Sequence, residues 1–182
     1  MKAVVQRVTN ASVVVDSKVT GSIRFGLLVY LGVAHDDTQS DADWLVEKIS
    51  HLRIFDDADG KMNLSLLDIV NHGKNMVNGN NVNHENTAGN RRENSIGKRK
   101  NTLIGVLTVS QFTLLGDVRK GRRPSWEKAA PPEMAKELYL YFMSRIRARG
   151  LNSEGGEFQA RMKVNYTNEG PVTILLDSAE SR

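Results

Sequence analysis

The chain has 182 residues, a length that fits one domain with a sizeable hydrophobic core. It contains no cysteine, which excludes a disulfide scaffold, a thiolate nucleophile and any cysteine-ligated zinc or iron–sulfur site. The longest apolar run, residues 25–34, is too short to span a bilayer, and Arg7 interrupts the segment that a secretory signal would need. We therefore expect a soluble, cytoplasmic protein with no membrane partner.

The formal net charge of +4 comes from one segment of the chain. Between Asn71 and Asn101 lie six of the 25 basic residues and two of the 21 acidic residues, which leaves 19 of each elsewhere. The remainder of the chain is formally neutral. Its overall charge is therefore no argument that the folded part binds nucleic acid.

The first third of the chain predicts strands followed by a helix. Residues 2–15 are interpreted as a strand pair or one long bent strand, and residues 27–31 as a second buried strand. Apolar residues at helical spacing predict a helix over about residues 40–52. A short strand follows and ends in an acidic turn at residues 56–60, which we interpret as a solvent-exposed turn.

The composition changes between Asn71 and Asn101, where ten of 31 residues are asparagine and large apolar side chains are few. Such a segment cannot bury enough apolar surface to offset its ordering entropy, so we expect a disordered insertion at about residues 71–101. Its histidines, His72 and His84, would lack a fixed scaffold, and we expect no metal site. Two interpretations of its basic end stay open: contact with RNA phosphates, or a solvated loop.

One stretch that begins at Leu103, LIGVLTVSQFTLLGD, predicts a buried strand that ends in polar residues. Its first seven residues are almost continuously apolar, as expected of a strand covered on both faces. Ser110, Gln111 and Thr113 then place two hydroxyls and an amide around Phe112. Buried polar groups are costly unless they are hydrogen-bonded. Either the strand runs out into solvent, or its end forms the floor of a site.

The last third of the chain predicts a loop with several basic residues at residues 116–125, a second helix over residues 131–150 and strands at residues 160–166 and 172–176. We predict that one stripe of this helix is buried: Met134, Leu138, Tyr141, Phe142 and Ile146. The order of the elements predicts an α/β fold. We expect a single domain, residues 1–182, with mostly antiparallel, curled, barrel-like sheets and two main helices.

Two motifs in the second half of the chain resemble those of one family. SQFTL at residues 110–114 and NEGPVT at residues 168–173 closely resemble motifs of the D-aminoacyl-tRNA deacylases, the D-tyrosyl-tRNA deacylase family. The resemblance extends to residues 3–8, 121–126 and 158–162, and so covers the chain except for the insertion. It implies a homodimeric hydrolase that removes D-amino acids from D-aminoacyl-tRNA in translation quality control, with no cofactor and no metal.

The resemblance implies that the SQFTL strand lines the pocket, with Ser110, Gln111, Phe112 and Thr113 supplying polar side chains and backbone donors. An aminoacyl ester is already activated, so it mainly needs positioning, a donor for the developing oxyanion and an ordered water. A lone threonine hydroxyl without a base is a poor nucleophile at neutral pH. We therefore expect Thr113 to act as a hydrogen-bonding group in a reaction assisted by the substrate's own ribose hydroxyl. Phe112 favours a D-specific enzyme over a relative with a smaller residue there.

The resemblance also implies a chiral filter. An X–Pro bond is ordinarily trans, but the family's Gly–Pro, here Gly170 and Pro171, is cis and enters the pocket of the dimer mate. Its carbonyls occupy the place of an L side chain, Arg7 holds the motif, and Met162 lies on the strand that precedes it. Because glycine has no side chain to reject, we expect activity on glycyl-tRNA as well.

Gln159, Arg161 and Glu169 depart from the family pattern, and the first two bear on the outer contacts of the pocket. Two other functions are alternatives: a non-catalytic RNA-binding module and a general small-ester hydrolase. The formally neutral remainder, without aromatic residues interleaved among basic ones, argues against the first. The lack of a recognisable nucleophile–base pair argues against the second.

Overall fold

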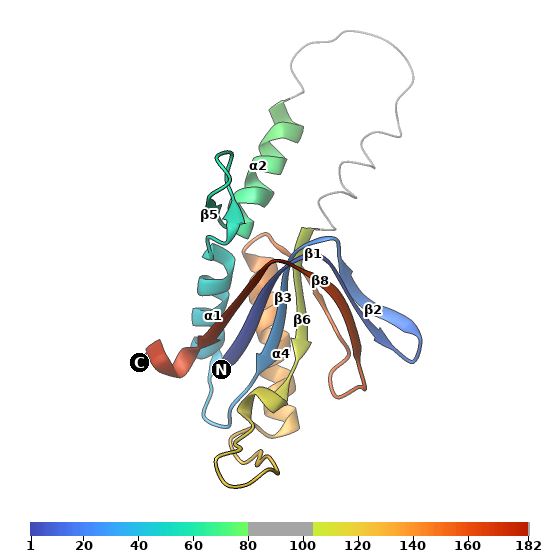
Figure 1. Cartoon of the computed structure of the whole chain (residues 1–182), viewed down its shortest axis with the longest axis vertical. Helices are drawn as coiled ribbons and strands as arrows, with labels where there is room; N and C mark the ends of the chain where they lie inside the picture. Colours follow the sequence, from blue (N-terminus) through green and yellow to red (C-terminus); the bar gives the residue numbers. More distant parts are fainter. Residues whose placement is uncertain (80–103, 182) are drawn as a thin grey trace.

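The computed structural model describes residues 1–79 and 104–181, so the part of the predicted insertion from residue 80 to 101 lies outside the described residues. A curled six-stranded sheet has the order β2-β1-β3-β6-β7, and β8 pairs with β1 (Figure 1). Its strands are β1 (Lys2–Val15), β2 (Lys18–Ile23), β3 (Phe25–Gly32), β6 (Ile104–Ser110), β7 (Asn152–Gly155) and β8 (Lys163–Asp177). A separate antiparallel pair consists of β4 (Phe55–Asp56) and β5 (Met62–Leu64).

β1 is one long strand that three other strands share. Its first half pairs with β3, its second half pairs with β2, and β8 runs antiparallel to both halves. Successive side chains of a strand point to opposite faces, and the alternately buried residues of β1 follow this period. Of the two interpretations of residues 2–15, one long bent strand is therefore confirmed.

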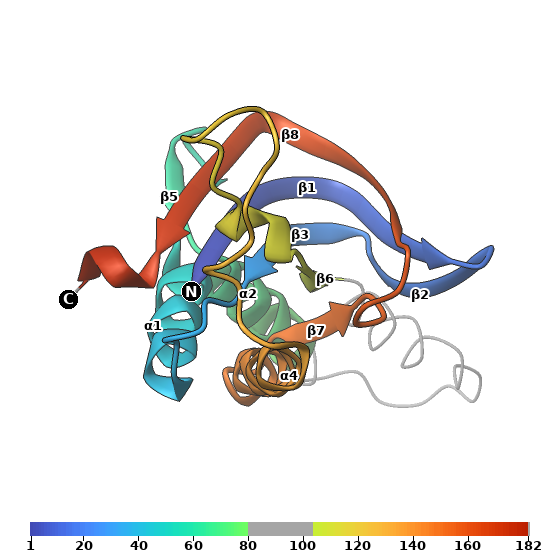
Figure 2. The same ribbon diagram turned by 90° about the horizontal axis from the view of Figure 1, so that it is seen from below.

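The sheet is mixed, because β6 runs parallel to both β3 and β7 while the pairings of β1 are antiparallel. Figure 2 shows how strongly the strands curl. The predicted α/β domain with curled, mostly antiparallel pairing is confirmed, but the parallel pairs were not predicted. Parallel neighbours need a long crossover connection, which runs through α1 and α2 between β3 and β6 and through α4 between β6 and β7. No local turn signal in the sequence indicates such a pairing.

The prediction of two main helices is wrong, because the described residues already contain three helices: α1 (Gln39–His51), α2 (Leu66–Gly79) and α4 (Pro132–Ala148). A capping box starts α2: the side chain of Asp68 accepts from the backbone of Ser65, and the Ser65 hydroxyl accepts from the backbone N–H of Asp68. The helix continues into residues 71–79, which the asparagine-rich composition had placed in the insertion. No helix among the described residues is long and apolar enough to cross a membrane.

Two clusters of apolar side chains form the core. The larger cluster packs the sheet against the helices, which lie on the same side of it in Figure 2, and the smaller one lies among β1, β2, β3 and β6. The buried residues of α4 are Leu138, Tyr139, Phe142, Met143 and Ile146. Tyr139 and Met143 were not predicted, whereas Met134 and Tyr141 of the predicted stripe are only partly buried and pack at the margin of the core.

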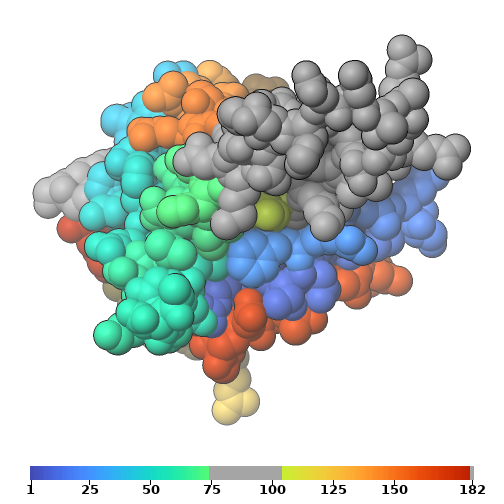
Figure 3. Space-filling view, turned by 90° about the horizontal axis from the view of Figure 1, so that it is seen from above, coloured from blue at the N-terminus to red at the C-terminus, as the bar shows by residue number. Residues whose placement is uncertain are grey.

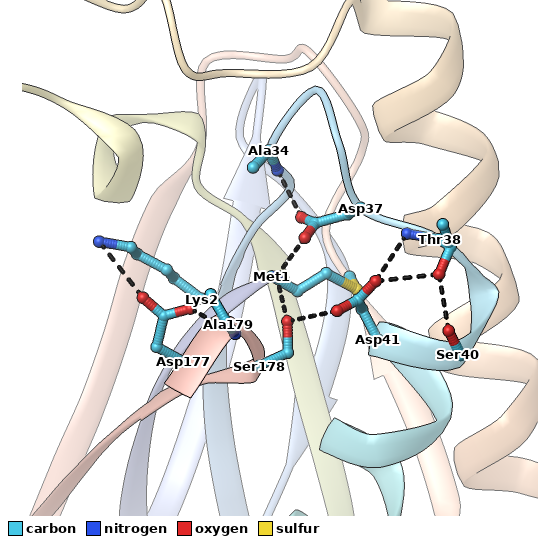
Figure 4. Close-up of polar contacts among 10 residues, drawn as sticks. All are labelled: Met1, Lys2, Ala34, Asp37, Thr38, Ser40, Asp41, Asp177, Ser178 and Ala179. Carbon is cyan, nitrogen blue, oxygen red and sulfur yellow. Dashed lines mark hydrogen bonds and ion pairs between the residues drawn. The ribbon is translucent and has the colours of Figure 1, made fainter. Parts of the chain in front are cut away.

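A buried polar network joins the two ends of the described chain (Figure 4). The ammonium group of Met1 donates to Asp37 Oδ1 and to the hydroxyl of Ser178, which lies in the 3₁₀ helix η2 (Ser178–Ser181). Ser178 in turn donates to Asp41 Oδ1 at 2.8 Å, and Asp41 Oδ2 accepts the backbone N–H of Thr38 at 2.9 Å. The network therefore connects the first strand, the start of α1 and the end of β8.

Replacing Asp37 by asparagine should lower the free energy of unfolding by roughly 3 kcal/mol, because the buried Met1 ammonium loses its countercharge. The matched control is Lys2→Gln, which removes the partly exposed ion pair between Lys2 and Asp177 at 3.6 Å. A pair of that kind contributes at most about 1 kcal/mol. Urea denaturation followed by circular dichroism measures both variants, and equal losses would contradict the role assigned to Asp37.

Candidate active site

A cavity of about 550 Å³ lies where β3 and β6 end. Ser110, at the end of β6, lines it together with Gln111 and Phe112, which lead into the 3₁₀ helix η1 (Phe112–Leu115). Tyr139 of α4 and the turn at residues 158–162 form the opposite walls. None of its lining residues is a histidine, an aspartate, a glutamate, a lysine or an arginine. The polar end of the buried strand therefore faces a largely apolar cavity that is partly open to solvent.

The close packing of η1 over the end of β3 holds the strand end in this position. The backbone N–H of Gln111 donates to the carbonyl oxygen of Leu31 at 2.8 Å, which continues the parallel ladder past the end of β6. A Cβ atom on Gly32 would lie 2.5 Å from Leu115 Cδ2 and 3.0 Å from the carbonyl oxygen of Gln111. Only glycine at position 32 leaves room for η1 to pack over the end of β3.

The structure separates the four residues of the predicted catalytic group. Ser110, Gln111 and Phe112 line the cavity, whereas Thr113 is exposed and is not among the lining residues. The Gln111 side-chain amide donates to the hydroxyl of Thr113, and Ser110 has no side-chain hydrogen bond within the described part of the chain. Thr113 can therefore act on the cavity by orienting Gln111, while the Ser110 hydroxyl is available to a ligand.

Tyr139 is a cavity residue that sequence reasoning missed. Its buried hydroxyl lies 3.0 Å from the carbonyl oxygen of Thr108 and 3.2 Å from that of Gly156, and so joins α4 to β6 and to the turn beyond β7. Burial raises the pKa of Tyr139 to about 12. The hydroxyl is therefore protonated at neutral pH and donates its hydrogen bond to these carbonyl oxygens. In the sequence, the helical spacing of Tyr139 from Phe142 and Ile146 could have identified it as a buried residue.

The turn at residues 158–162 contributes Met162 and Gln159 to the cavity wall. The sulfur of Met162 fills the space above Gly156, where an added Cβ would lie 2.4 Å from it. Gln159 has a φ of 65°, a left-handed backbone conformation that is unfavourable for a residue with a Cβ atom. Gln159, one of the departures from the family pattern, therefore adds backbone strain as well as a polar side chain. Arg161 is exposed.

Replacing Gln159 by glycine should raise the free energy of unfolding by about 1 kcal/mol, because the left-handed conformation is free of strain for glycine and its greater unfolded-state entropy offsets only part of that gain. Gln159→Ala is the matched control, since alanine removes the amide but keeps the Cβ atom. Denaturation of both variants provides the measurement. If alanine stabilised the fold as much as glycine, the side chain and not the backbone would be the source of the strain.

The Gly170–Pro171 bond is cis, as the resemblance implies. The motif interrupts the pairing of β1 with β8: Gln6 pairs with Thr173 and Val8 with Asn168, so four residues of β8 lie opposite one residue of β1. Such a bulge makes the strand bend outward. Gly170 and Pro171 are exposed, and neither lines the cavity of its own chain.

Arg7 is the β1 residue opposite this bulge, and its side chain is largely buried. Its Nη1 donates to the carbonyl oxygen of Ile54 at 2.7 Å and lies 3.4 Å from Asp56 Oδ1. Its Nε lies 3.9 Å from Oε2 of Glu169, the third residue that departs from the family pattern. A Cβ added to Gly170 would lie 3.0 Å from Arg7 Nη2. The Arg7 side chain therefore lies directly against the Gly–Pro motif.

Asn168 is a further residue that supports the motif and that sequence reasoning did not single out. Its Oδ1 accepts the backbone N–H of Val172 at 3.2 Å, and its Nδ2 donates to the hydroxyl of Thr173 at 3.1 Å. The side chain thus bridges the Gly170–Pro171 pair. An asparagine that precedes Gly-Pro was the available signal, because Asn side chains commonly hydrogen-bond the backbone of turns.

The predicted site residues therefore form two separate groups in one chain. The first group contains Ser110, Gln111, Phe112 and Met162 around the cavity, with Thr113 beside it. The second group contains Gly170, Pro171 and Arg7, on the outer part of the sheet. No cluster of three or more histidine, aspartate or glutamate side chains suited to a metal ion occurs among the described residues.

Comparison with known proteins identifies the family. The family model described as D-Tyr-tRNA(Tyr) deacylase matches residues 4–77 and 85–177. The chain belongs to this deacylase family. A D-aminoacyl-tRNA deacylase of Koribacter versatilis is 49% identical over 178 residues, which cover 98% of this chain and 97% of the relative. One of Bacillus pumilus is 44% identical over 180 residues, with 99% and 100% covered.

Solved structures share the fold of this deacylase-family chain. A protein titled c-Myc DNA unwinding element binding protein superposes with a TM-score of 0.73 at 35% identity, covering 97% of this chain and 98% of that one. A probable eukaryotic D-amino acid tRNA deacylase superposes with a TM-score of 0.69 at 18% identity, covering 96% and 97%. The second likeness concerns the fold alone.

Proposed function

We propose that the chain hydrolyses the ester bond of D-aminoacyl-tRNA and releases the free D-amino acid and tRNA. The observation that carries this proposal is the composition of the cavity, which offers hydrogen-bonding groups at Ser110 and Gln111 but no histidine or carboxylate. Such a site suits an ester that is already activated, because positioning and oxyanion stabilisation suffice. The names of the relatives, which cover almost the whole chain, support the same activity.

The proposed reaction uses water as the nucleophile. Its oxygen adds to the ester carbonyl carbon, and backbone N–H groups around Phe112 and the Ser110 hydroxyl stabilise the oxyanion that forms. The bond between the carbonyl carbon and the ribose oxygen then breaks, and that oxygen takes up a proton. Because the cavity supplies no base, the neighbouring ribose hydroxyl of the substrate assists the proton transfer. Thr113 holds the Gln111 amide in place during the reaction.

The proposed assembly is a homodimer in which each protomer inserts Gly170–Pro171 into the cavity of its partner. Two features of the chain support this arrangement: the motif is exposed, and it does not line the cavity of its own protomer. The same strand also exposes Leu175, whose exposed fraction is 76%. Main-chain carbonyl groups then occupy the place of an L side chain, so L-aminoacyl-tRNA is excluded by contact with the backbone. The enzyme would act in the cytoplasm, where tRNA is charged.

The purified protein should cleave D-Tyr-tRNA and glycyl-tRNA and leave L-Tyr-tRNA and a nitrophenyl ester intact. Glycine passes the filter because it has no side chain, whereas a steric clash of roughly 3 kcal/mol corresponds to about a 100-fold preference against L-tyrosine. Release of labelled amino acid measures all four reactions. Binding of D-Tyr-tRNA without turnover would indicate an RNA-binding module, and cleavage of every ester would indicate a general esterase. Intact glycyl-tRNA at excess enzyme would contradict the main-chain filter.

Gly170→Ala should reduce cleavage of D-Tyr-tRNA at least about tenfold or allow cleavage of L-Tyr-tRNA. The added Cβ would lie 2.8 Å from Val172 Cγ2 and 3.0 Å from Arg7 Nη2, at a φ of 112° that is unfavourable for alanine. Gly60→Ala is the matched control, because Gly60 also has a positive φ, 73°, but has open space where its Cβ would be. Unchanged kinetics and an unchanged elution volume of Gly170→Ala in size-exclusion chromatography would argue against the proposed filter.

A further inference from the structure

We propose that the basic loop, residues 117–128 between η1 and α4, binds phosphates of the tRNA strand whose 3′ end enters the cavity. The loop carries five basic and two acidic residues, whereas the charges of the chain outside residues 71–101 cancel. Positive charge is thus concentrated beside the site, and the rest of the fold is correspondingly acidic. This inference rests on the proposed function, because it assigns the loop to binding of the same substrate.

The basic loop is attached to the cavity at both of its ends. Asp117 and Ser125 exchange two backbone hydrogen bonds of 2.9 Å, which hold together the two ends of the segment between them. Beyond the loop, the backbone N–H of Ala130, a cavity residue, donates to the carbonyl oxygen of Val33 at 2.9 Å. The ring of Trp126 packs edge-on against Phe112, with 5.2 Å between centroids. A substrate held at Phe112 therefore lies next to the loop.

The cations of the basic loop are mostly unneutralised. Arg119 is paired with Asp117, and this guanidinium holds the pKa of the Asp117 carboxyl well below its usual range. No ion pair within the described part of the chain involves Lys120, Arg122 or Arg123, and all three are exposed. Three cations that the fold itself does not use are therefore available to an anionic partner.

The shape of the loop and its neighbours favours RNA as that partner. Gold-coloured atoms of this region project beyond the outline of the sheet in Figure 3. Two aromatic side chains with substantial exposure lie at the base of the loop, Trp126 at 40% and Phe112 at 56%. Cations beside exposed aromatic rings are the combination that binds single-stranded nucleic acid, with phosphates on the cations and bases stacked on the rings. The sequence shows no alternation of basic and aromatic residues, but the fold brings Phe112 against Trp126 beside these cations.

A membrane surface fits the basic loop less well. Peripheral binding to lipid relies on an apolar helical face or on several inserted apolar side chains. The loop has no helix, and its strongly exposed aliphatic residue is Val118, at 61%. The basic loop also lies beside the cavity that is proposed to hold the aminoacylated 3′ end, so RNA bound there would be part of the substrate. Lipid binding at this place would have no such link to the cavity.

The test combines a triple variant with two substrates. Lys120→Gln, Arg122→Gln and Arg123→Gln together should lower kcat/KM for D-Tyr-tRNA at least about tenfold at low salt. Hydrolysis of D-tyrosyl adenosine, the same ester without any phosphate, should stay within about twofold of the wild-type rate, because the loop does not line the cavity floor. The slope of log kcat/KM for tRNA against log salt should become shallower by about 2, since each single-strand phosphate contact contributes about 0.7.

The matched control removes the same charge elsewhere, with Lys18→Gln, Arg24→Gln and Lys61→Gln, three exposed residues away from the cavity. It should leave both activities and the salt slope unchanged. The proposal is overturned if the loop variant loses both substrates equally, if it keeps full activity on tRNA, or if the control loses as much. It is also overturned if wild-type protein binds vesicles of phosphatidylserine and phosphatidylcholine more tightly than tRNA.

Binding of D-Tyr-tRNA, measured by fluorescence anisotropy, separates this inference from the proposed function. If the wild-type protein cleaves neither substrate, the proposed activity fails. The loop is then tested by binding alone: at least about tenfold weaker binding by the loop variant than by the control variant supports the phosphate surface, and equal binding overturns it.

Discussion

The hydrogen bonding of β1 along its full length is the constraint on which the rest of the structure depends. One strand holds β3 and β2 on one edge and β8 on the other, so the curvature of the sheet and the course of the last strand are set together. The bulge of β8 at Gly170–Pro171 lies opposite Arg7 of β1. Val5 and Val8, which lie near Arg7 in β1, belong to the core. The position of the motif is thereby tied to the most buried part of the fold.

The cavity shows how little side-chain chemistry the proposed reaction needs. Its single ionisable lining residue is Tyr139, whose hydroxyl is committed to two carbonyl groups and whose pKa is raised to about 12 by burial. The remaining polar groups can donate or accept hydrogen bonds but cannot remove a proton at neutral pH. Rate acceleration must then come from orientation of the ester and from the substrate's own hydroxyl. In the proposed mechanism, recognition is divided in the same way, between the cavity, the exposed Gly–Pro motif and the basic loop.

Periodicity predicted the elements whose burial follows a simple pattern, such as β1, α1 and α4. It could not show that β3 and β6 are parallel neighbours, because that pairing depends on residues far apart in the chain. The polar end of an apolar strand indicated Ser110 and Gln111, but the exposed position of Thr113 follows from the turn into η1. The cis bond at Pro171 was predicted from the family resemblance, since local sequence favours trans. The left-handed backbone of Gln159 had no local signal, because residues with a Cβ atom rarely adopt that conformation.

The pairing of β1 with β8 has a consequence for how the protein folds during synthesis. Lys2 pairs with Asp177, so contacts of very high sequence separation complete the sheet. Contacts of this kind form slowly. Until β8 leaves the ribosome, one whole edge of β1 exposes unpaired backbone groups, which are a template for association with other chains. Shielding of this edge until β8 has been synthesised would therefore reduce such association.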